Sequence, residues 1–350
     1  MHSTAAVKSL RALAGFGRTG RVPCRAMPSV EATVVIPTKD RWQVLSTSAL
    51  PSALGQEAVE LEVIVVDDGS TDATGRVLEE LREPRLRVIR HATPHGVARA
   101  RNAGIAAARG EWVAFLDDDD IWSPEKLRRQ IDAAEARQAS YAYSAAAWLD
   151  EDRRFLSAFE PPDPEGLAAR LLRWNELWAG CSNVVARTEV VRRLGAFDEQ
   201  LFQLADWDLW IRLACNERAS AVDDVLVGYV VHSESMLLTD RRDVFAEFHY
   251  LTTKHRELSA RIGARPDPAK FWRWVAAGQL RAGRRRTAAR TYAHGALVSS
   301  EPALLLRALA SLSGRTGFTS LRAFSRKVRG DDPAKLPALE PPWIASFRDA

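Results

Sequence analysis

The stretch Trp112-Val113-Ala114-Phe115-Leu116-Asp117-Asp118-Asp119-Asp120 decides how this chain is interpreted. A short apolar run, rich in residues that favour β-structure, ends in four consecutive carboxylates. The run predicts a buried strand, and open α/β sheets bind their ligands at the carboxyl ends of such strands. Adjacent carboxylates repel one another, and no packing role requires them. We therefore predict that a cation neutralises them, with a divalent metal carrying phosphate groups as the natural candidate.

Three further strands are predicted before this one, at residues 32–37, 61–66 and 86–89. They alternate with helical patterns, the first of which covers residues 42–55. Four strands that alternate with helices indicate a parallel α/β sheet with helices on both faces. If the strand order is 3-2-1-4, the loops that follow the first, second and fourth strands line one edge of the sheet. That edge would bring Thr38 to Arg41, Asp67 and Asp68 close to the four carboxylates.

Local signals predict where the helices begin and end. Ser70 and Asp72 are candidate N-caps for the helix that runs to Leu81. Gly110 is expected to close the next helix as its C′ glycine. Ser123-Pro124-Glu125 is typical of a helix start, with a cap, a proline in the first turn and an acid.

Two nucleotide-binding folds are excluded by the loop after the first strand. A dinucleotide fold would carry a glycine-rich G-x-G-x-x-G motif there. This chain has Pro37-Thr38-Lys39-Asp40, without a glycine, and no phosphate-binding P-loop follows. Acids dominate this edge of the sheet, which suits a diphosphate bridged by a metal and a base held by hydrogen bonds.

The composition describes a globular protein with basic ends. The chain has 350 residues, 46% of them apolar, and a net charge of +4. Arginine and lysine cluster in the first thirty residues and after residue 280, which suits anionic lipid, a polyanionic substrate or merely solvated helix faces. The three cysteines, Cys24, Cys181 and Cys215, have no zinc or disulfide spacing, which favours a reducing compartment. No apolar run is long enough to cross a membrane.

Several motifs together resemble glycosyltransferase family 2 of the GT-A fold. They occur in the family's order over about residues 30–235, and their combination is far more specific than any one of them. The motifs are Val35-Ile36-Pro37-Thr38, Val65-Val66-Asp67-Asp68-Gly69-Ser70-Thr71-Asp72, Ala100-Arg101-Asn102-Ala103-Gly104, Gly110-Glu111 through Asp120, Leu194-Gly195-Ala196-Phe197-Asp198-Glu199, and Asp206-Trp207-Asp208-Leu209-Trp210-Ile211-Arg212.

The resemblance implies a nucleotide-sugar donor and assigns residues to it. Pro37, Thr38 and Lys39 would border the nucleotide base, and Asp68 would hydrogen-bond it. Arg99 or Arg101 would help to hold the nucleotide. Asp118 belongs to the same nucleotide-binding set, within the element that corresponds to the family's D-x-D motif.

The resemblance also implies a divalent metal, Mg²⁺ or Mn²⁺, and a catalytic base. Asp117 and Asp119 would bind the metal, which would bridge the donor's diphosphate, and His232 in Tyr229-Val230-Val231-His232 is a further candidate ligand. Asp206 corresponds to the family's general base. One base with in-line displacement implies inversion at the anomeric carbon. Purely structural roles stay open as alternatives: Asp68 as a turn residue, Asp206 as a helix cap, and His232 as a structural histidine.

Two positions depart from the family pattern. The aromatic residue that stacks on the base is replaced by Lys39, and the acid before the catalytic aspartate is replaced by Ala205. These departures keep a non-catalytic sugar-nucleotide-binding module open as an alternative. A nucleotidyltransferase is a weaker alternative because it would carry a glycine-rich basic loop after the first strand.

The acceptor would be a glycan or a lipid-linked molecule, and no nucleic acid is expected as a partner. Trp174 and Trp178, four residues apart in a predicted helix, would share one face and form core or stack on a sugar. The leucines of residues 304–312 are expected to pack on the catalytic domain. We predict a basic leader over residues 1–30, a GT-A domain over 31–239 and a helical extension over 240–350. The expected location is the cytoplasm, with possible peripheral contact at the anionic inner face of the membrane.

Overall fold

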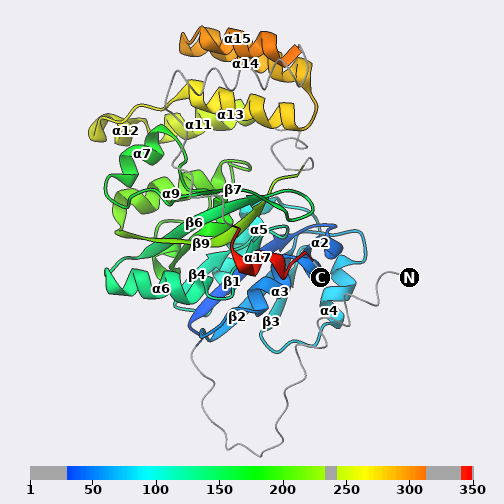
Figure 1. Ribbon diagram of the computed structural model, residues 1–350. Helices are drawn as coiled ribbons and strands as arrows, with labels where there is room; N and C mark the ends of the chain where they lie inside the picture. Colours follow the sequence, from blue (N-terminus) through cyan, green and yellow to red (C-terminus); the bar gives the residue numbers. More distant parts are fainter. Residues whose placement is uncertain (1–29, 233–242, 313–339, 349–350) are drawn as a thin grey trace, which may run out of the picture. The chain divides into compact units, whose positions relative to one another are not determined.

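The computed structural model describes residues 30–232, 243–312 and 340–348, which fall into two compact units (Figure 1). The first unit comprises Met1–Glu165, Leu177–Val230 and Leu336–Ala350, and the second comprises Gly166–Glu176 and Val231–Lys335. The predicted basic leader, except for residue 30, lies outside the described residues. The predicted boundary between residues 239 and 240 also lies outside them and stays a prediction.

The first unit is an α/β structure built on one mixed sheet. Its elements in chain order are β1 (Ala32–Thr38), α2 (Trp42–Thr47), α3 (Ala49–Leu54), β2 (Leu61–Asp67), α4 (Thr74–Glu80), β3 (Leu86–Arg90), α5 (Val97–Ala107), β4 (Trp112–Phe115), β5 (Ile121–Trp122), α6 (Lys126–Ala136), β6 (Tyr141–Leu149), β7 (Phe155–Phe159), η1 (Gly180–Asn183), β8 (Val185–Arg187), α8 (Thr188–Arg193), α9 (Ala205–Asn216), β9 (Ala219–Val230) and α17 (Pro342–Ala345).

The strand order is β3-β2-β1-β4-β8-β6-β9-β5, with β7 paired to β6. The first four strands are parallel and confirm the predicted order 3-2-1-4. The sheet then changes direction, because β8 is antiparallel to both β4 and β6. The α/β fold class predicted from the sequence is therefore confirmed, with a mixed second half added to the parallel first half.

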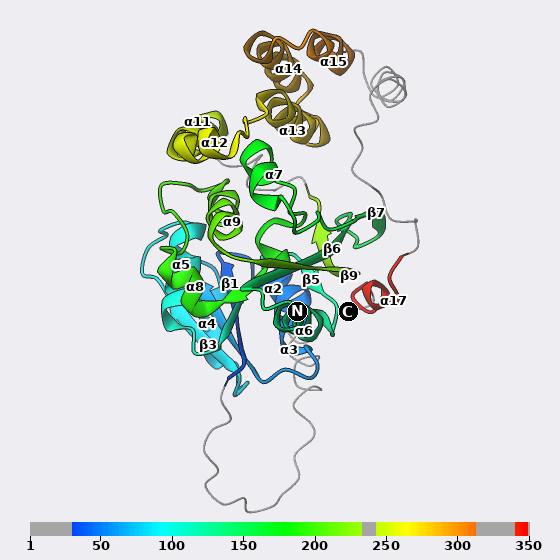
Figure 2. The same cartoon turned by 90° about the vertical axis from the view of Figure 1, so that its left-hand side faces the viewer.

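Helices cover both faces of the parallel half, as the fully buried β1 requires. Val34 and Ile36 of β1 share a core cluster with Leu50 of α3. The opposite face of β1 packs on α5, where a Cβ atom at Gly104 would lie 2.3 Å from Cγ1 of Val35. Glycine at position 104 thus lets α5 approach the sheet closely. Figure 2 shows α5 and α3 on opposite sides of the strands.

Four local predictions were wrong. The helix expected over residues 42–55 is divided into α2 and α3 at Ser48, because the ring of Pro51 would clash with the carbonyl of Thr47 in a continuous helix. Gly110 does not cap α5, which ends at Ala107. Glycine is needed there because a Cβ atom would lie 2.5 Å from the Thr33 nitrogen.

The third wrong prediction concerns α6, which begins at Lys126 with Glu125 as its N-cap residue and no side-chain cap. Ser123 contributes its carbonyl oxygen to Lys126 N instead of its hydroxyl. Neither predicted cap of α4 is its N-cap residue, which is Ala73. Asp72 accepts from Thr74 N, whereas Ser70 accepts from the backbone of Asp40 in another loop.

The second unit is helical. Its elements are α7 (Leu167–Arg173), α11 (Val244–Lys254), α12 (Arg256–Ile262), α13 (Pro268–Arg281), α14 (Arg285–Ser299) and α15 (Ala303–Leu312). Helices α13, α14 and α15 share a small core that includes Ala276, Tyr292 and Leu304. Among the described residues, no helix combines the length and apolar character that crossing a bilayer requires.

The expectation that the two tryptophans share a helical face was wrong, and the packing of the α15 leucines on the catalytic domain stays a prediction. Helix α7 ends at Arg173, so Trp174 and Trp178 do not share a helical face. Trp178 stacks on Phe159 of β7 at 4.8 Å in the first unit, and Trp174 packs edge-on against Trp274 in the second. In α15, Leu304 is buried in the helical core, but the remaining leucines are exposed.

Candidate active site

Thr38, the last residue of β1, joins the two acidic strand ends. Its carbonyl oxygen accepts a hydrogen bond from Asp68 N at 2.9 Å, and its hydroxyl donates to Oδ2 of Asp118 at 2.8 Å. The parallel register of β1 with β2 and β4 brings the carboxyl ends of all three strands to one edge. The structure therefore brings together Thr38, Asp68 and Asp118, as the sequence predicted.

Asp68 is held at the end of β2 by three donors. Oδ1 lies 2.7 Å from Nδ1 of His91, the backbone N–H of His95 donates to both carboxylate oxygens, and the Gly96 N–H donates to Oδ2 at 2.7 Å. The preceding turn requires glycine, because Gly69 has φ +74° and a Cβ atom there would lie 2.7 Å from Pro94 N. The carboxylate is thereby fixed in one orientation.

The sequence patterns did not identify His91 as a partner of Asp68. Its ring lies edge-on to that of His95, with 5.1 Å between the centroids. The only signal available was a histidine directly after a strand neighbouring Asp68. A lone histidine in such a loop is compatible with many roles, so the pattern did not identify it.

Asp40 ties the loop after β1 to the loop after β2. Its Oδ1 accepts from the backbone N–H groups of Thr71 and Asp72, and these hydrogen bonds hold the pKa of Asp40 below its usual value. The backbone of Asp40 is left-handed, with φ +54°. The adjacent Lys39 is exposed, and Pro37 is buried within β1. Loop geometry therefore places Lys39 at the surface beside the Thr38–Asp68 contact.

Two arginines meet the four carboxylates that follow β4. The Nη2 atom of Arg41 donates to Oδ2 of Asp119 at 2.8 Å, and its Nε lies 3.5 Å from Oδ1 of Asp118. The Nη2 atom of Arg101, a buried side chain of α5, donates to Oδ1 of Asp117 at 2.5 Å. In the part of the chain that the structure describes, Arg41 and Arg101 thus bring positive charge to these carboxylates.

Burial and mutual repulsion perturb the carboxyl groups inside this cluster. Burial and the charge of Asp119 raise the pKa of Asp118 to about 7, against the opposing effects of Arg41 and the Thr38 hydroxyl. Burial and its acidic neighbours raise the pKa of Asp120 well above its usual value. A bound cation would favour the ionised forms of both groups.

The donor set fits a divalent cation whose remaining ligands come from a substrate. Carboxylate oxygens are the hard ligands that Mg²⁺ and Mn²⁺ prefer, and Mg²⁺ is usually held by one or two carboxylates together with phosphates and water. Within the described residues, no group of three or more His, Cys, Asp or Glu side chains is arranged to hold a metal. Asp117 and Asp119 would accordingly provide two ligands rather than a complete cage.

The short helix η1 fixes the far side of the cluster. The Ser182 hydroxyl donates to Oδ2 of Asp120 at 2.5 Å and accepts from Asp117 N at 3.1 Å. The second oxygen of Asp120 accepts from Val230 N at 2.9 Å. Asp120 is completely buried and acts as a structural anchor, so the four consecutive acids do not share one role.

Asp206 stands in the first turn of α9, next to η1. A Cβ atom at Gly180, which has φ +49°, would lie only 3.0 Å from Oδ2 of Asp206. Burial raises the pKa of Asp206 to about 6, although the charge of Arg101 and the N–H of Trp207 lower it. Arg101 therefore interacts with both Asp117 and Asp206, which places the predicted base and the β4 carboxylates in one electrostatic environment.

The two candidate arginines of α5 have different surroundings. Arg101 is buried at the carboxylates, whereas Arg99 is exposed and lies 3.6 Å from Glu199. Asn102 supports the same region, because its side chain exchanges hydrogen bonds with the backbone of Phe197. His232 is a half-buried residue of the second unit, and its metal-binding role stays a prediction.

The Asp208 carboxylate, two residues after Asp206, has a structural role. It is completely buried and lies 2.6 Å from Nη2 of Arg212, whose guanidinium also donates to the carbonyls of Leu194 and Ala196. These contacts fix α9 against the loop before it. The two acids of the first turn thus divide into one that faces the site and one that anchors the helix.

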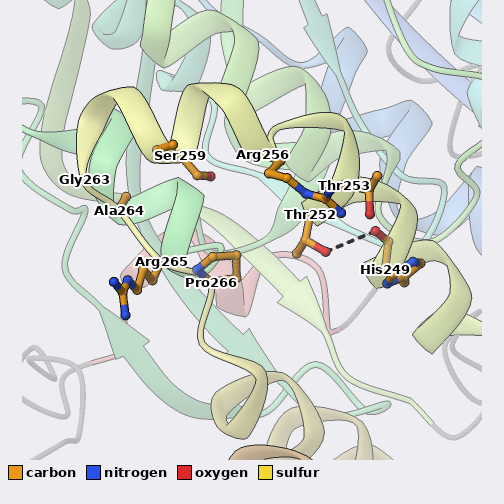
Figure 3. Close-up of a pocket in the computed structure, with 10 residues that line it drawn as sticks. His249, Thr252, Thr253, Arg256, Ser259, Gly263, Ala264, Arg265 and Pro266 are labelled. Carbon is orange, nitrogen blue, oxygen red and sulfur yellow. Dashed lines mark hydrogen bonds between the residues drawn. The ribbon is translucent and has the colours of Figure 1, made fainter.

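The second unit contains a cavity of about 660 Å³ between α11, α12 and the following turn (Figure 3). Its lining combines hydroxyl groups with basic side chains, including Thr252, Arg256 and Arg265. The Thr252 hydroxyl donates to the His249 carbonyl at 3.1 Å. None of the site residues predicted from the sequence lines this cavity.

Comparisons with known proteins show which family residues 33–195 resemble. Residues 33–195 match the family described as glycosyl transferase family 2. The chain is 35% identical over 195 residues to the succinoglycan biosynthesis protein ExoO of Rhizobium meliloti, which covers 53% of this chain and 56% of that protein. The chain thus spans little more than half the length of that relative.

A second relative and a solved structure extend the comparison. The chain is 27% identical over 205 residues to the UDP-Glc:alpha-D-GlcNAc-diphosphoundecaprenol beta-1,3-glucosyltransferase WfaP of Escherichia coli, covering 58% of this chain and 79% of that protein. The crystal structure of S. aureus TarS 1-349 in complex with UDP-GlcNAc has the same fold, with a TM-score of 0.51 and 19% identity over 85% of this chain and 76% of that one. Residues 33–195 of this chain therefore form a domain that matches glycosyltransferase family 2.

Proposed function

We propose that this protein is an inverting glycosyltransferase that moves a sugar from a nucleotide donor to a hydroxyl of a glycan or lipid-linked acceptor. The observation that carries the proposal is the position of Arg101. Its buried guanidinium contacts Asp117 at the end of β4, and its charge lowers the pKa of Asp206 in α9. A group that stabilises a diphosphate and a carboxylate that accepts a proton are thereby combined in one site.

Asp206 suits the role of general base. Its pKa of about 6 keeps it ionised at neutral pH, and it remains a stronger base than an ordinary aspartate. It lies beside Gly180, where an added Cβ atom would lie only 3.0 Å from its Oδ2. The acceptor hydroxyl would lose its proton to Asp206 as it attacks the anomeric carbon, which gives inversion in one step.

The donor would be held at the edge formed by β1, β2 and β4. Thr38 and Asp68, which lie at this edge, would contact the nucleoside, and Pro37 and Lys39 would border it. A divalent Mg²⁺ or Mn²⁺ ion held by Asp117 and Asp119 would neutralise the charge that develops on the departing diphosphate. Arg101 supplies a fixed positive charge on the same side.

The names of the relatives support the class of donor and acceptor. WfaP is named as a transferase from UDP-glucose to a diphosphoundecaprenol-linked sugar, and the TarS structure contains UDP-GlcNAc. We therefore propose a UDP- or dTDP-sugar as the donor. ExoO is named for the biosynthesis of a polysaccharide, which supports a glycan or its lipid-linked precursor as the acceptor.

Turnover of the donor by wild type and Asp206→Asn tests the proposal. The release of nucleoside diphosphate from UDP-glucose and UDP-GlcNAc would be measured with Mg²⁺ or Mn²⁺, and donor binding would be measured by calorimetry. We expect Asp206→Asn to lower turnover by about 10²–10⁴-fold while donor binding is retained. Asp223→Asn, at an exposed position of β9, is the matched control and should behave as wild type.

The same measurements separate the alternatives. Donor binding with equal, negligible turnover in both proteins would favour a non-catalytic sugar-nucleotide-binding module. Transfer of the nucleotidyl group, detected as release of sugar phosphate, would favour a nucleotidyltransferase. Either result would overturn the proposed glycosyl transfer.

A further inference from the structure

The largest exposed aliphatic side chains of the described residues gather on the last two helices of the second unit. Helix α15 exposes Leu305, Leu306, Leu309 and Leu312 to between 45% and 67%, and the end of α14 exposes Leu297 to 77% and Val298 to 54%. Only Leu156 and Ile262 are comparable elsewhere in the described chain. We call these six residues the apolar face of α14 and α15. Such a concentration of exposed apolar surface indicates an interaction site.

Helical periodicity explains why these leucines remain exposed. Leu304, Ala308 and Ser311 form the buried side of α15, which packs within the core of α13, α14 and α15. The leucines lie on the remaining surface of the same helix. The helical core therefore uses one side of α15, and the exposed leucines lie outside it.

A basic stripe continues this face along α14. Arg286, Arg290 and His294 are exposed and are spaced four residues apart, so they share one helical face with Leu297. Together with Arg284 and Arg285, the two arginines of this stripe form no ion pair or side-chain hydrogen bond with the described residues. Positive charge is thus available immediately next to the apolar face.

The charge of the three helices is almost entirely of one sign. From residue 268 to residue 312 the chain carries eight basic residues and one acid. They are Lys270, Arg273, Arg281, Arg284, Arg285, Arg286, Arg290 and Arg307, against Glu301. An amphipathic helical surface with arginines beside leucines is complementary to a bilayer with anionic lipids.

Charge also decides between the possible occupants of this face. A second copy would bring two strongly basic helical units together, which like-charge repulsion disfavours. Residues 313–339 of the same chain carry six basic residues and two acids, so they are a poor electrostatic match as well. An anionic lipid surface alone offers both apolar depth and negative charge. We propose that the apolar face of α14 and α15, with its flanking arginines, docks the protein on anionic membranes.

Vesicle co-sedimentation of the full chain tests this proposal. Vesicles of phosphatidylcholine alone are compared with vesicles that contain about one-third phosphatidylglycerol, at low and high salt. The wild type should bind the anionic vesicles, and binding should weaken as salt increases. Leu306→Ser combined with Leu309→Ser should lower the affinity at least tenfold. Arg286→Ser combined with Arg290→Ser should remove the preference for anionic lipid.

Matched controls lie in the first unit. Leu156→Ser changes a leucine of β7 that is 54% exposed, and Arg154→Ser changes an arginine whose side chain is 69% exposed. Both variants should bind vesicles as the wild type does. Circular dichroism would verify that every variant retains its helices.

Three results would overturn the proposal. The first is wild-type protein that stays in the supernatant at low salt, and the second is unchanged binding by both double variants. The third is a wild-type protein that is a dimer by sedimentation equilibrium and does not bind vesicles, together with a leucine double variant that is a monomer. The apolar face would then be a subunit interface. The assay does not measure sugar transfer, so its outcome is independent of the proposed catalytic function.

Discussion

The carboxylates that follow β2 and those that follow β4 lie at the same edge of one sheet, but their surroundings differ. Asp68 accepts hydrogen bonds from His91 and from two backbone N–H groups. Among the described residues, Arg41 and Arg101 contact the four acids after β4, and burial with mutual repulsion raises the pKa of Asp118 to about 7. The protein itself satisfies the carboxylate after β2, whereas the cluster after β4 still attracts positive charge. The first arrangement suits a fixed contact and the second suits a metal ion with its substrate.

The largest expected difference between the two strand ends is in catalysis. Asp119→Asn should lower turnover about 10³-fold, because it removes both a proposed metal ligand and negative charge from the β4 cluster. Part of the loss should be recovered at higher Mg²⁺ or Mn²⁺ concentration, which titration of metal against turnover would measure. Asp132→Asn, on the exposed side of α6, is the control. If the metal dependence of turnover in Asp119→Asn equals that of the wild type, the acids after β4 do not bind the metal as proposed.

The second difference should appear in the free energy of unfolding, and it should be larger at the end of β2. Asp68→Ala leaves three donors at the β2 end without their acceptor, so we expect a loss of about 3 kcal/mol in the free energy of unfolding. That loss corresponds to a factor of roughly 10² in the unfolding equilibrium constant. Urea titration would measure it, with Asp152→Ala at an exposed turn as the control. A loss below about 1 kcal/mol would show that these hydrogen bonds contribute little to the free energy of unfolding.

Sequence patterns predicted the backbone of this edge better than its side-chain partners. Alternation of strands and helices predicted the parallel sheet, and the order 3-2-1-4 that was assumed for it is the observed order. The positions of Asp68 and Asp118 followed from strand ends alone. The contacts of Arg41 and Arg101 did not, since a guanidinium reaches several residues away and periodicity does not reveal its direction.

The errors have physical causes of the same kind. Gly110 was interpreted as a helix cap, but its close approach to the Thr33 backbone is a contact between segments far apart in sequence. Ser182 was not predicted as a site residue, yet its hydroxyl contacts Asp120. Thr33 lies 77 residues before Gly110 in the chain, and Asp120 lies 62 residues before Ser182. No local pattern contains that information.

The third prediction concerns the link between η1 and the base. Gly180→Ala would place a methyl group about 3 Å from Oδ2 of Asp206 and would strain a left-handed backbone position. Displacement of the base should lower turnover by about 10–10²-fold. Gly195→Ala is a matched control, because Gly195 also has positive φ but its Cβ would meet nothing within 4 Å. Equal activity of the two variants would show that the contact with Asp206 has no catalytic consequence.

The fourth prediction uses pH to separate Asp206 from the strand-end acids. A base must be ionised, so turnover should rise with pH and approach a plateau above the pKa of about 6. One pH unit below that midpoint, the rate should be roughly tenfold lower. The measurement is turnover against pH at saturating metal, where a bound cation keeps the β4 acids ionised. A rate that is flat between about pH 5 and pH 7 would exclude Asp206 as the base.

The smallest effect should be a gain in stability at the β4 end. Asp118→Asn removes a buried negative charge from beside Asp119, and its amide oxygen can still accept from the Thr38 hydroxyl. We expect the metal-free variant to be more stable than wild type by about 1 kcal/mol, measured by urea titration without divalent ions. Asp68→Asn, at the satisfied strand end, is the matched comparison and should not gain stability.

The pH dependence of that gain tests its cause. Because the folded-state pKa of Asp118, about 7, lies above the ordinary 3.8, the stability from its bound proton is fully present below the ordinary value. It is lost as the pH rises toward and through 7, where the folded wild type must carry the charge. Asparagine does not titrate, so the advantage of Asp118→Asn should grow between about pH 4 and pH 7 and level off above that range. Added Mg²⁺ should reduce the advantage, because the ion neutralises the wild-type cluster; an advantage that is constant with pH and Mg²⁺ would mean that charge is not its source.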